Sequence, residues 1–349
     1  MDRPELVALI RGGEMISGAD LAGVDLSGAN LSGAIMEKVS LVGARLSGAT
    51  LQESYLGRCD LTGADLSGAN LTRTVFNDCS LVGATLRDAN MLKAKILGSN
   101  LAQADLTGAK LTLAALSQVD LTSACLAGTN LDRTAILDAK TTGISLAGAT
   151  LRRTSLLKAD LTTALLTGAR FELAVLVGSK LAGRDLAGID LTLTQLTGCD
   201  LSGCNLSGAT LTQCGFKDAD LTGANLGAAR ANGALFVDAK LVRANLAAAS
   251  LFQAIFAGAD LSEAICSRAN LEQCNFSRAT CRGAQFDDAN LTYADFTHAD
   301  ISRSTFVGAT LFRARFHRPK EDGTVWGSRA TALGDDRELA DAERWQPTH

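Results

Sequence analysis

Residues 63–71 read GADLSGANL, and close variants of this stretch recur along most of the chain. An α-helix returns side chains to one face about every 3.6 residues, and a β-strand does so every second residue. A period of five residues suits neither element. The stretch therefore predicts a repeat array, which grows by stacking layers rather than by enlarging one core.

The large apolar residue at the centre of each five-residue unit defines the register. The centres fall at Ile16, Leu21 and every fifth position to Phe316, which makes 61 units without an insertion or deletion. Leu, Ile, Met or Phe fills 57 of these positions, and the exceptions are Thr141, Ala231, Cys266 and Cys281. A small residue, usually Ala, stands two positions before each centre, a polar residue usually lies between them, and Gly is common two positions after the centre.

This pattern, A-[D/N]-L-x-x, resembles the pentapeptide-repeat family over residues 14–318. The resemblance implies an all-β solenoid, a right-handed quadrilateral β-helix in which four units, or 20 residues, make one square coil, so that this chain would form about 15 coils. It also implies that the centre and the small residue point inward and that the other three positions of each unit face solvent.

The residue types agree with such coils. Asp and Asn favour tight bends by bonding nearby backbone groups, and Gly supplies the positive φ that turns require. Proline cannot donate to a backbone ladder, and the chain's three prolines, Pro4, Pro319 and Pro347, all lie outside the array. Centres that lie 20 residues apart share a column, and one column ends in Phe216, Phe236, Phe256, Phe276, Phe296 and Phe316, which we expect to stack in the core.

The two ends of the array need covers, because open coil ends invite pairing between molecules. We therefore predict an N-terminal cap helix in residues 1–13, the quadrilateral β-helix in residues 14–318, and a C-terminal cap or tail in residues 319–349. The tail holds both tryptophans, Trp326 and Trp345, and residues 335–345 have helical spacing, so we expect a short helix there.

Composition narrows the class of protein. The net charge of −4 gives no excess of basic residues, so direct nucleic-acid binding is not expected. No apolar run approaches the ~18 residues of a membrane span. The first residues lack the features of a signal peptide, and the nine cysteines show no CxxC pair, which is typical of reduced thiols. These features predict a cytoplasmic protein, and we expect it to be of bacterial type.

The sequence contains no catalytic motif that we can identify. The three histidines, His298, His317 and His349, all lie near the C-terminus, and nucleophile elbows, phosphate loops and HExxH helices are missing. His298 and His317 are expected to approach each other on successive coils, without a constellation that completes a metal site. We predict a protein without enzymatic activity, cofactor or metal.

One face of the predicted coils is unusually apolar. On the face of the phenylalanine column, the residue before the centre is large and apolar at 7 of 16 positions, including Met15, against 2 of 45 on the other faces, Leu165 and Ile265. We call the following set the apolar stripe: Ile35, Tyr55, Val75, Leu97, Leu137, Leu157, Val175, Val177, Leu235, Val237 and Ile255. Exposed apolar patches mark interaction surfaces, although partial burial or β-propensity alone would also select such residues.

A second face carries a column of carboxylates before its centres. The acidic column comprises Asp20, Asp60, Asp120, Asp160, Asp200, Asp220, Asp260 and Asp300, and Lys140, Lys180 and Lys240 interrupt it. Some pentapeptide-repeat proteins resemble DNA through such columns and bind type II topoisomerases such as DNA gyrase. Aspartates that merely build turns on a solvated face would give the same pattern.

The function favoured by the sequence is a non-enzymatic scaffold or adaptor that binds protein partners through the apolar stripe, and a homodimer is one such arrangement. The first alternative is a DNA-mimic protein that binds a type II topoisomerase through the acidic column. A further alternative comes from the opening, LVALIRGGEMISGADLAGVDL, which is similar to pentapeptide-repeat proteins associated with type VI secretion systems.

Overall fold

Each five-residue unit forms one side of a coil because its centre is buried and the residues after the centre turn the chain. The backbone N–H three residues after a centre donates to the carbonyl of that centre, as Ala29 does to Leu26 at 2.9 Å. The residue two after the centre has a positive φ, for example 63° at Gly28 and 58° at Arg73. Glycine adopts this conformation freely, which explains why it is frequent there.

The coils repeat every 20 residues and pair in parallel, as Asp20 does with Ser40 and Ser40 with Asp60. The computed structural model describes residues 3–344, and the paired coils are those of a right-handed parallel β-solenoid of about 16 turns. The predicted solenoid of about 15 coils is confirmed, and the backbone winds on beyond the last repeat. The chain divides into two compact units, Met1–Lys180 and Leu181–His349, and each is described by itself.

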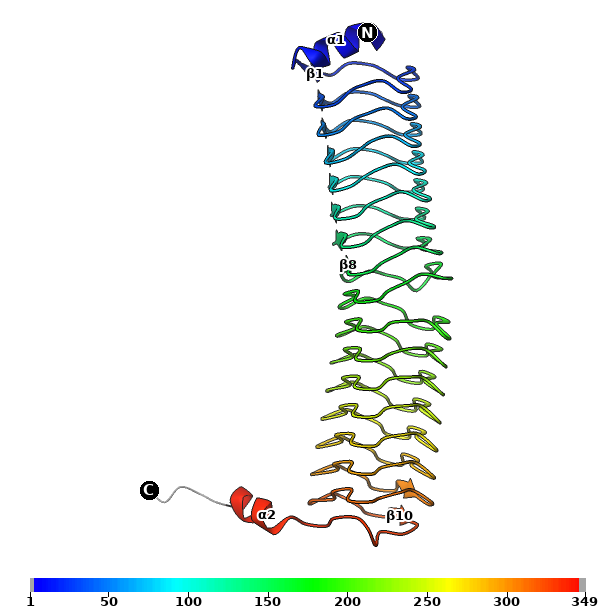
Figure 1. Ribbon diagram of the computed structural model, residues 1–349, viewed down its shortest axis with the longest axis vertical. Coiled ribbons are helices and arrows are strands. Elements are labelled where there is room, and N and C mark those ends of the chain that lie inside the picture. The colour runs from blue at the N-terminus through cyan, green and yellow to red at the C-terminus, as the bar shows by residue number, and fades with distance from the viewer. Residues whose placement is uncertain (1–2, 345–349) are drawn as a thin grey trace, which may run out of the picture. The chain divides into compact units, whose positions relative to one another are not determined.

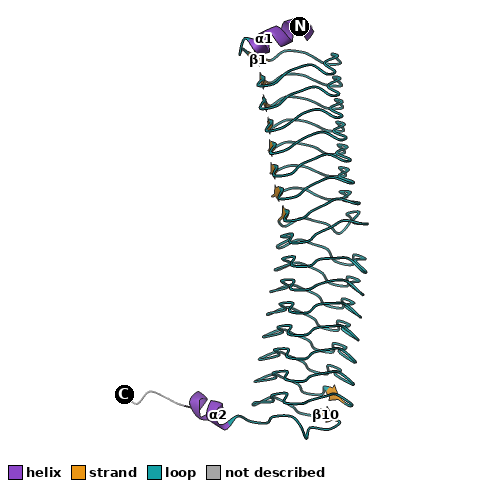
Figure 2. Ribbon diagram, in the orientation of Figure 1, coloured by secondary structure: helices purple, strands orange, loops and turns teal. Residues whose placement is uncertain are grey.

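The first unit, blue to green in Figure 1, begins with helix α1 (Arg3–Arg11), whose Leu6 and Ile10 are buried. Eight short strands then lie one above the next along one side of the coils, shown in orange in Figure 2, and form a parallel sheet in chain order. They are β1 (Met15–Ser17), β2 (Ile35–Glu37), β3 (Tyr55–Gly57), β4 (Val75–Asn77), β5 (Lys95–Leu97), β6 (Ala115–Ser117), β7 (Ala135–Leu137) and β8 (Ser155–Leu156). The middle residue of each strand from β1 to β7, and the last residue of β8, is a centre of the phenylalanine column.

The second unit contains β9 (Thr305–Phe306), β10 (Val325–Trp326) and helix α2 (Arg337–Arg344). The predicted phenylalanine ladder is confirmed: successive rings from Phe216 to Phe316 stack with centroids 4.6–5.0 Å apart and nearly parallel planes. A second ladder, which we did not predict, runs through Phe286, Phe306 and Trp326 and meets the first edge to face.

The winding beyond the last repeat comes from residues after Phe316, where the five-residue pattern has ended. β10 pairs with β9 and Lys320 pairs with Asp300 at the usual spacing of 20 residues, and Leu333 then pairs with Arg315 at a spacing of 18 residues. The backbone therefore keeps winding, with a register that shortens by two residues at its end. The guanidinium of Arg329 lies 5.1 Å from the ring centroid of Phe316 and 4.6 Å from that of Trp326, and so covers the end of both ladders.

The predicted division into residues 1–13, 14–318 and 319–349 stays a prediction, and Trp345, Pro347 and His349 lie outside the described residues. Within residues 3–344, neither helix has the length and apolar character needed to cross a lipid bilayer. All nine cysteines are free thiols, as the sequence indicates, and all except Cys125 are buried.

Candidate interaction surfaces

At the start of the first unit, the apolar stripe and the neighbouring Met15 form a continuous row. Met15, Ile35, Tyr55 and Val75 are direct partners on the adjacent strands β1 to β4, so their side chains stack at about 4.8 Å along the outside of the sheet. Tyr55 remains 38% exposed, and Val75 is half-buried. Lys95 is the next partner in the row and ends this apolar run.

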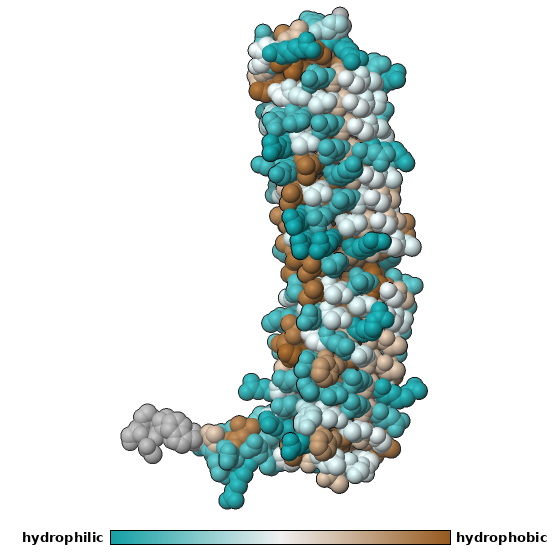
Figure 3. All heavy atoms as spheres, in the orientation of Figure 1, coloured by the Kyte–Doolittle hydropathy of each residue, from teal (hydrophilic) through white to brown (hydrophobic). Residues whose placement is uncertain are grey.

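The rest of the stripe in the first unit is less continuous. Leu97 and Leu137 flank Ser117 on strands β5 to β7, and both leucines, like Leu157 and Val175, are half-buried, whereas Val177 is exposed. Figure 3 shows apolar side chains gathered at intervals along the edge that carries β1 to β8, with polar side chains between them. The stripe is therefore present in this unit as separate apolar patches on a polar surface.

In the second unit the stripe borders helix α2, which sequence reasoning did not foresee. Leu235 pairs with Ile255 on the next coil and is 41% exposed, and Ile255 is half-buried. Val237, on the same face, lines a groove of about 430 Å³ together with Ala257, Leu339 and Glu343. Leu339 and Glu343 belong to α2, so this helix forms one wall of a groove that opens on the apolar stripe.

The acidic column lies on a different side of each coil, and its carboxylates build turns. In all eight cases the backbone N–H two residues later donates to the carboxylate, at distances from 2.9 to 3.2 Å. The Thr162 hydroxyl and backbone amide hold the pKa of Asp160 below its ordinary value. One oxygen of each carboxylate is thus committed to its own turn.

The accessibility of the acidic column varies along the chain. Asp20 and Asp60 are exposed, Asp120, Asp160, Asp200, Asp220 and Asp260 are half-buried, and Asp300 is buried. Lys140 binds Asp120 at 3.1 Å, and Arg282 binds Asp300 at 2.7 Å. These cations reduce the negative charge that a DNA-binding partner would meet.

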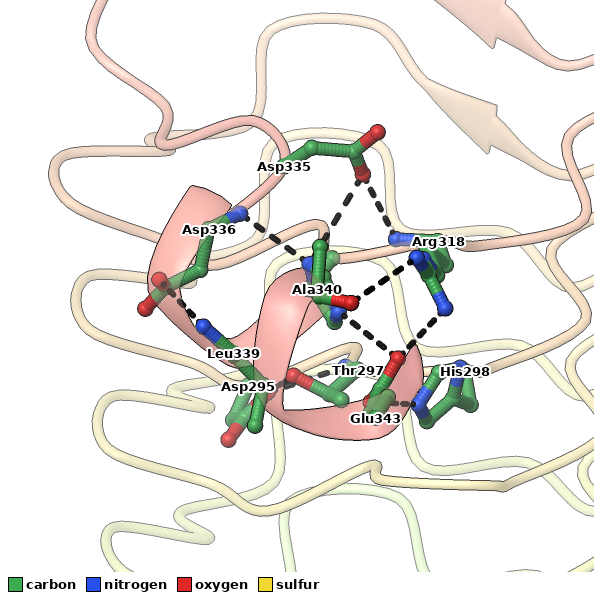
Figure 4. A network of polar contacts seen from close by, with 10 residues as sticks. Asp295, Thr297, His298, Arg318, Asp335, Asp336, Leu339, Ala340 and Glu343 are labelled. Carbon is green, nitrogen blue, oxygen red and sulfur yellow. Dashed lines mark hydrogen bonds and ion pairs between the residues drawn. The ribbon is translucent and has the colours of Figure 1, made fainter. Parts of the chain in front are cut away.

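A polar network fastens α2 to the final coils (Figure 4). The Glu343 carboxylate of α2 lies 2.8 Å from Nε2 of His298 and 2.6 Å from the guanidinium of Arg318. The His298 hydrogen bond is the largest cause that holds the pKa of Glu343 below its ordinary value, and partial burial opposes it. As predicted, His298 and His317 approach each other, with ring centroids 5.4 Å apart.

Within residues 3–344, one cluster of side chains has the residue types that bind metal ions, and its possible ligand atoms lie within 4.8 Å of one another. The cluster consists of His298, His317 and Glu343. Nδ1 of the buried His317 accepts the N–H of Asp336 at 3.0 Å, so Nε2 carries the ring proton and faces Glu343 at 3.5 Å. A protonated nitrogen has no lone pair for a metal ion, and Arg318 already neutralises the carboxylate. We therefore assign the cluster to holding α2, and the expectation of no metal site stays a prediction.

A sequence profile described as pentapeptide repeats matches the chain in eight copies, at residues 16–53, 54–91, 99–134, 144–183, 174–213, 219–256, 254–292 and 279–318. The chain belongs to the pentapeptide-repeat family. Pentapeptide repeats thus account for well over half of its length and for the 20-residue coil.

Solved pentapeptide-repeat structures are similar to parts of the chain. Full-length QnrB1, described as a plasmid-mediated fluoroquinolone resistance protein, is 21% identical over 52% of this chain and 91% of its own, with a TM-score of 0.43. HetL, from the cyanobacterium Nostoc sp. strain PCC 7120, is 25% identical over 78% of this chain and 96% of its own, with a TM-score of 0.24. Rfr23, from the cyanobacterium Cyanothece 51142, is 21% identical over 40% of this chain and 92% of its own, with a TM-score of 0.24.

We draw no functional conclusion from these similarities, because all three TM-scores are below 0.5. No curated protein sequence matches the chain.

Proposed function

We propose that the chain is a non-enzymatic scaffold or adaptor of the cytoplasm, which binds partner proteins through the apolar stripe. The observation that carries this proposal is the continuous row of Met15, Ile35, Tyr55 and Val75 on strands β1 to β4. Exposed, adjacent apolar side chains on a surface that is otherwise polar are typical of protein interfaces. A second copy of the chain is one partner of this kind.

The proposed lack of catalysis is supported by what the polar side chains do. The aspartates of the acidic column accept backbone hydrogen bonds in turns, and His298 and His317 are engaged in fastening α2. These groups have structural tasks that explain their positions.

The test is capture of partners from a bacterial lysate, with quantification by mass spectrometry. A Tyr55→Glu/Leu235→Glu variant places a charge on the stripe of each unit. The matched control is Leu165→Glu/Ile265→Glu, which makes the same change at apolar side chains that are 51% and 37% exposed on another face. Circular dichroism and thermal unfolding establish that both variants fold.

We expect a partner that wild type and the control retain and that the stripe variant loses by at least tenfold. A set of partners that is the same for all three folded proteins would show that the stripe only packs the surface, and the proposed function would then be wrong.

The DNA-mimic alternative is supported less well, because the acidic column is committed to turns and partly neutralised by Lys140 and Arg282. Gyrase retained equally by the stripe variant and the control would favour it. The alternative of a type VI secretion adaptor stays a prediction from the opening sequence.

A further inference from the structure

One corner of the first unit carries an unusual row of residues. The corner positions two residues after the centre, taken at intervals of 20 residues, are held by Arg73, Lys93, Leu113, Arg133, Arg153 and Leu173. All six have a positive φ, between 55° and 61°. We call this row the corner ridge; its six members lie on consecutive coils and are each basic or leucine.

The leucines of the ridge occupy a conformation that leucine disfavours. Among the non-glycine residues with positive φ in the first unit, Leu113 and Leu173 are the two large apolar ones, and the others are polar or charged. Leu113 is 41% exposed and therefore gains little from burial within the chain. Leu173 is half-buried. An exposed leucine in a conformation that leucine disfavours, as Leu113 is, suggests a role outside the fold.

The ridge also lies in a strongly basic band. The six segments 70–75, 90–95, 110–115, 130–135, 150–155 and 170–175 contain eight basic residues and two acidic ones, a net charge of +6 in a chain whose total is −4. The acidic residues Asp132 and Glu172 pair with Arg133 and Arg152, and Glu53, one coil earlier, pairs with Arg73. Within the described residues, the other five basic residues of these segments form no ion pair. They are Lys93, Lys95, Lys110, Arg153 and Arg170.

The combination of cations and leucines in this basic band indicates which kind of surface it can bind. Each of the six coils carries at least one cation beside this corner, and successive coils lie about 4.8 Å apart, which is less than a Debye length of about 8–10 Å. A flat anionic surface that meets the corner therefore attracts the whole row of cations. Leu113 and Leu173 are three coils apart, or about 14 Å, and both stand on the corner itself. Phosphates of a nucleic acid would bind the cations but give the leucines no apolar contact, whereas a bilayer offers headgroups and an acyl boundary together.

We propose that the corner ridge docks the first unit onto an anionic lipid surface, with the basic residues at the phosphate headgroups and Leu113 and Leu173 at the acyl boundary. This inference goes beyond the proposed scaffold function, because its partner is lipid and its residues lie outside the apolar stripe. The ridge borders the stripe at Val75 and Val175, so a docked chain would hold its protein partners near the membrane.

The experiment is flotation of the full chain with vesicles of phosphatidylglycerol and phosphatidylcholine, or of phosphatidylcholine alone, at 0.1 M salt. The charge variant is Arg73→Gln/Lys93→Gln/Arg133→Gln/Arg153→Gln. Glutamine is tolerated at such corners, because Gln213, Gln253 and Gln273 occupy the same register in the second unit with φ of 55–59°. The matched control removes the same charge at other corners: Arg243→Gln/Arg268→Gln/Arg278→Gln/Arg303→Gln.

Wild type and the control should float with the anionic vesicles and not with phosphatidylcholine alone. A basic residue near such a surface contributes about fivefold to binding, so the charge variant should partition at least one hundredfold more weakly. Equal flotation of the charge variant and the control would overturn the proposal, as would the absence of wild-type flotation.

A Leu113→Gly/Leu173→Gly variant tests whether the leucines contact lipid. It keeps every charge of the ridge, so a loss of vesicle binding in the folded variant cannot come from weaker attraction of anions. Glycine relaxes the positive φ, which offsets the packing lost at the half-buried Leu173, so we expect the thermal midpoint to stay close to that of wild type. Partitioning should weaken at least fivefold. Unchanged partitioning of this variant would overturn the insertion of the leucines. A DNA duplex that binds wild type but not the charge variant, without vesicle flotation, would make the ridge a nucleic-acid surface and would also overturn the proposal.

Discussion

At the scale of single residues, burial limits the reactivity of the cysteines. A hydrogen bond with Cys79 lowers the pKa of Cys59, but the Cys59 side chain is buried and out of reach of reagents. Eight of the nine thiols are buried among small and apolar side chains, and Cys125 alone is half-buried. Burial raises the pKa of Cys204 to about 11 and that of Cys214 and Cys266 to about 12. Since the thiolate is the reactive form, such groups are inert near neutral pH.

We therefore expect one fast-reacting thiol in the native chain, at Cys125, in a titration with Ellman's reagent at pH 8. All nine should react at once in 6 M guanidinium, and a Cys125→Ser variant should lose the fast phase. Three or more fast thiols in the native chain would mean that the small inward positions are open to solvent.

The residues at the coil corners show where single-residue reasoning from sequence succeeds. Glycine two positions after the centre predicts a positive φ, and Gly28 and Gly63 have it. The leucines of the corner ridge, Leu113 and Leu173, adopt the same φ although nothing in their local propensity favours it. There the coil imposes the backbone conformation, so the ridge emerges only when corners 20 residues apart are brought together.

At the scale of elements, helix α2 depends on the charge of Glu343. Hydrogen bonds hold the pKa of Glu343 below the ordinary glutamate value of 4.5, so this carboxylate stabilises the docking of α2 fully above about pH 4.5. The stabilisation is lost as the pH falls through the lower, folded value. His298, His317, Arg318 and Asp335 are the other charged or titratable groups that face this cluster.

We expect the hydrogen-exchange protection of α2, corrected for the intrinsic rate, to fall between pH 5 and pH 3 while that of the phenylalanine ladder persists. A Glu343→Gln variant should show at pH 7 the low protection that wild type reaches only in acid. Full protection of α2 in this variant would mean that Leu339 and the backbone hold the helix without the polar network.

The ends of the chain mark the limit of prediction for elements. The helical segments follow from local spacing, and α1 and α2 lie within the segments where they were expected. The sequence predicts only a cap or tail after residue 318, because residues 317–333 lack the five-residue pattern and wind through pairing with the coil before them. The position of α2 beside the apolar stripe depends on the same tertiary contacts, in particular His298, Arg318 and Glu343.

At the scale of the whole molecule, the period of five predicts the solenoid because each unit meets the same requirement: one buried centre, one small inward residue and one turn. The candidate surfaces are less determined by sequence. The residues of the apolar stripe and of the acidic column follow from the 20-residue coil, but the exposure of their side chains does not. Tyr55 is exposed, whereas Val75, its neighbour in the same row, is half-buried. The commitment of all eight aspartates of the acidic column to turns likewise required the structure.

The central claim, that partner proteins bind through apolar contacts of the stripe, is tested most directly by the affinity of the captured partner between 0.05 and 0.5 M salt. Contacts of apolar side chains are not screened by salt, so we expect the dissociation constant to change by less than about threefold over this range. A rise of tenfold or more would show that charged groups carry the association and would contradict the stripe as the binding surface.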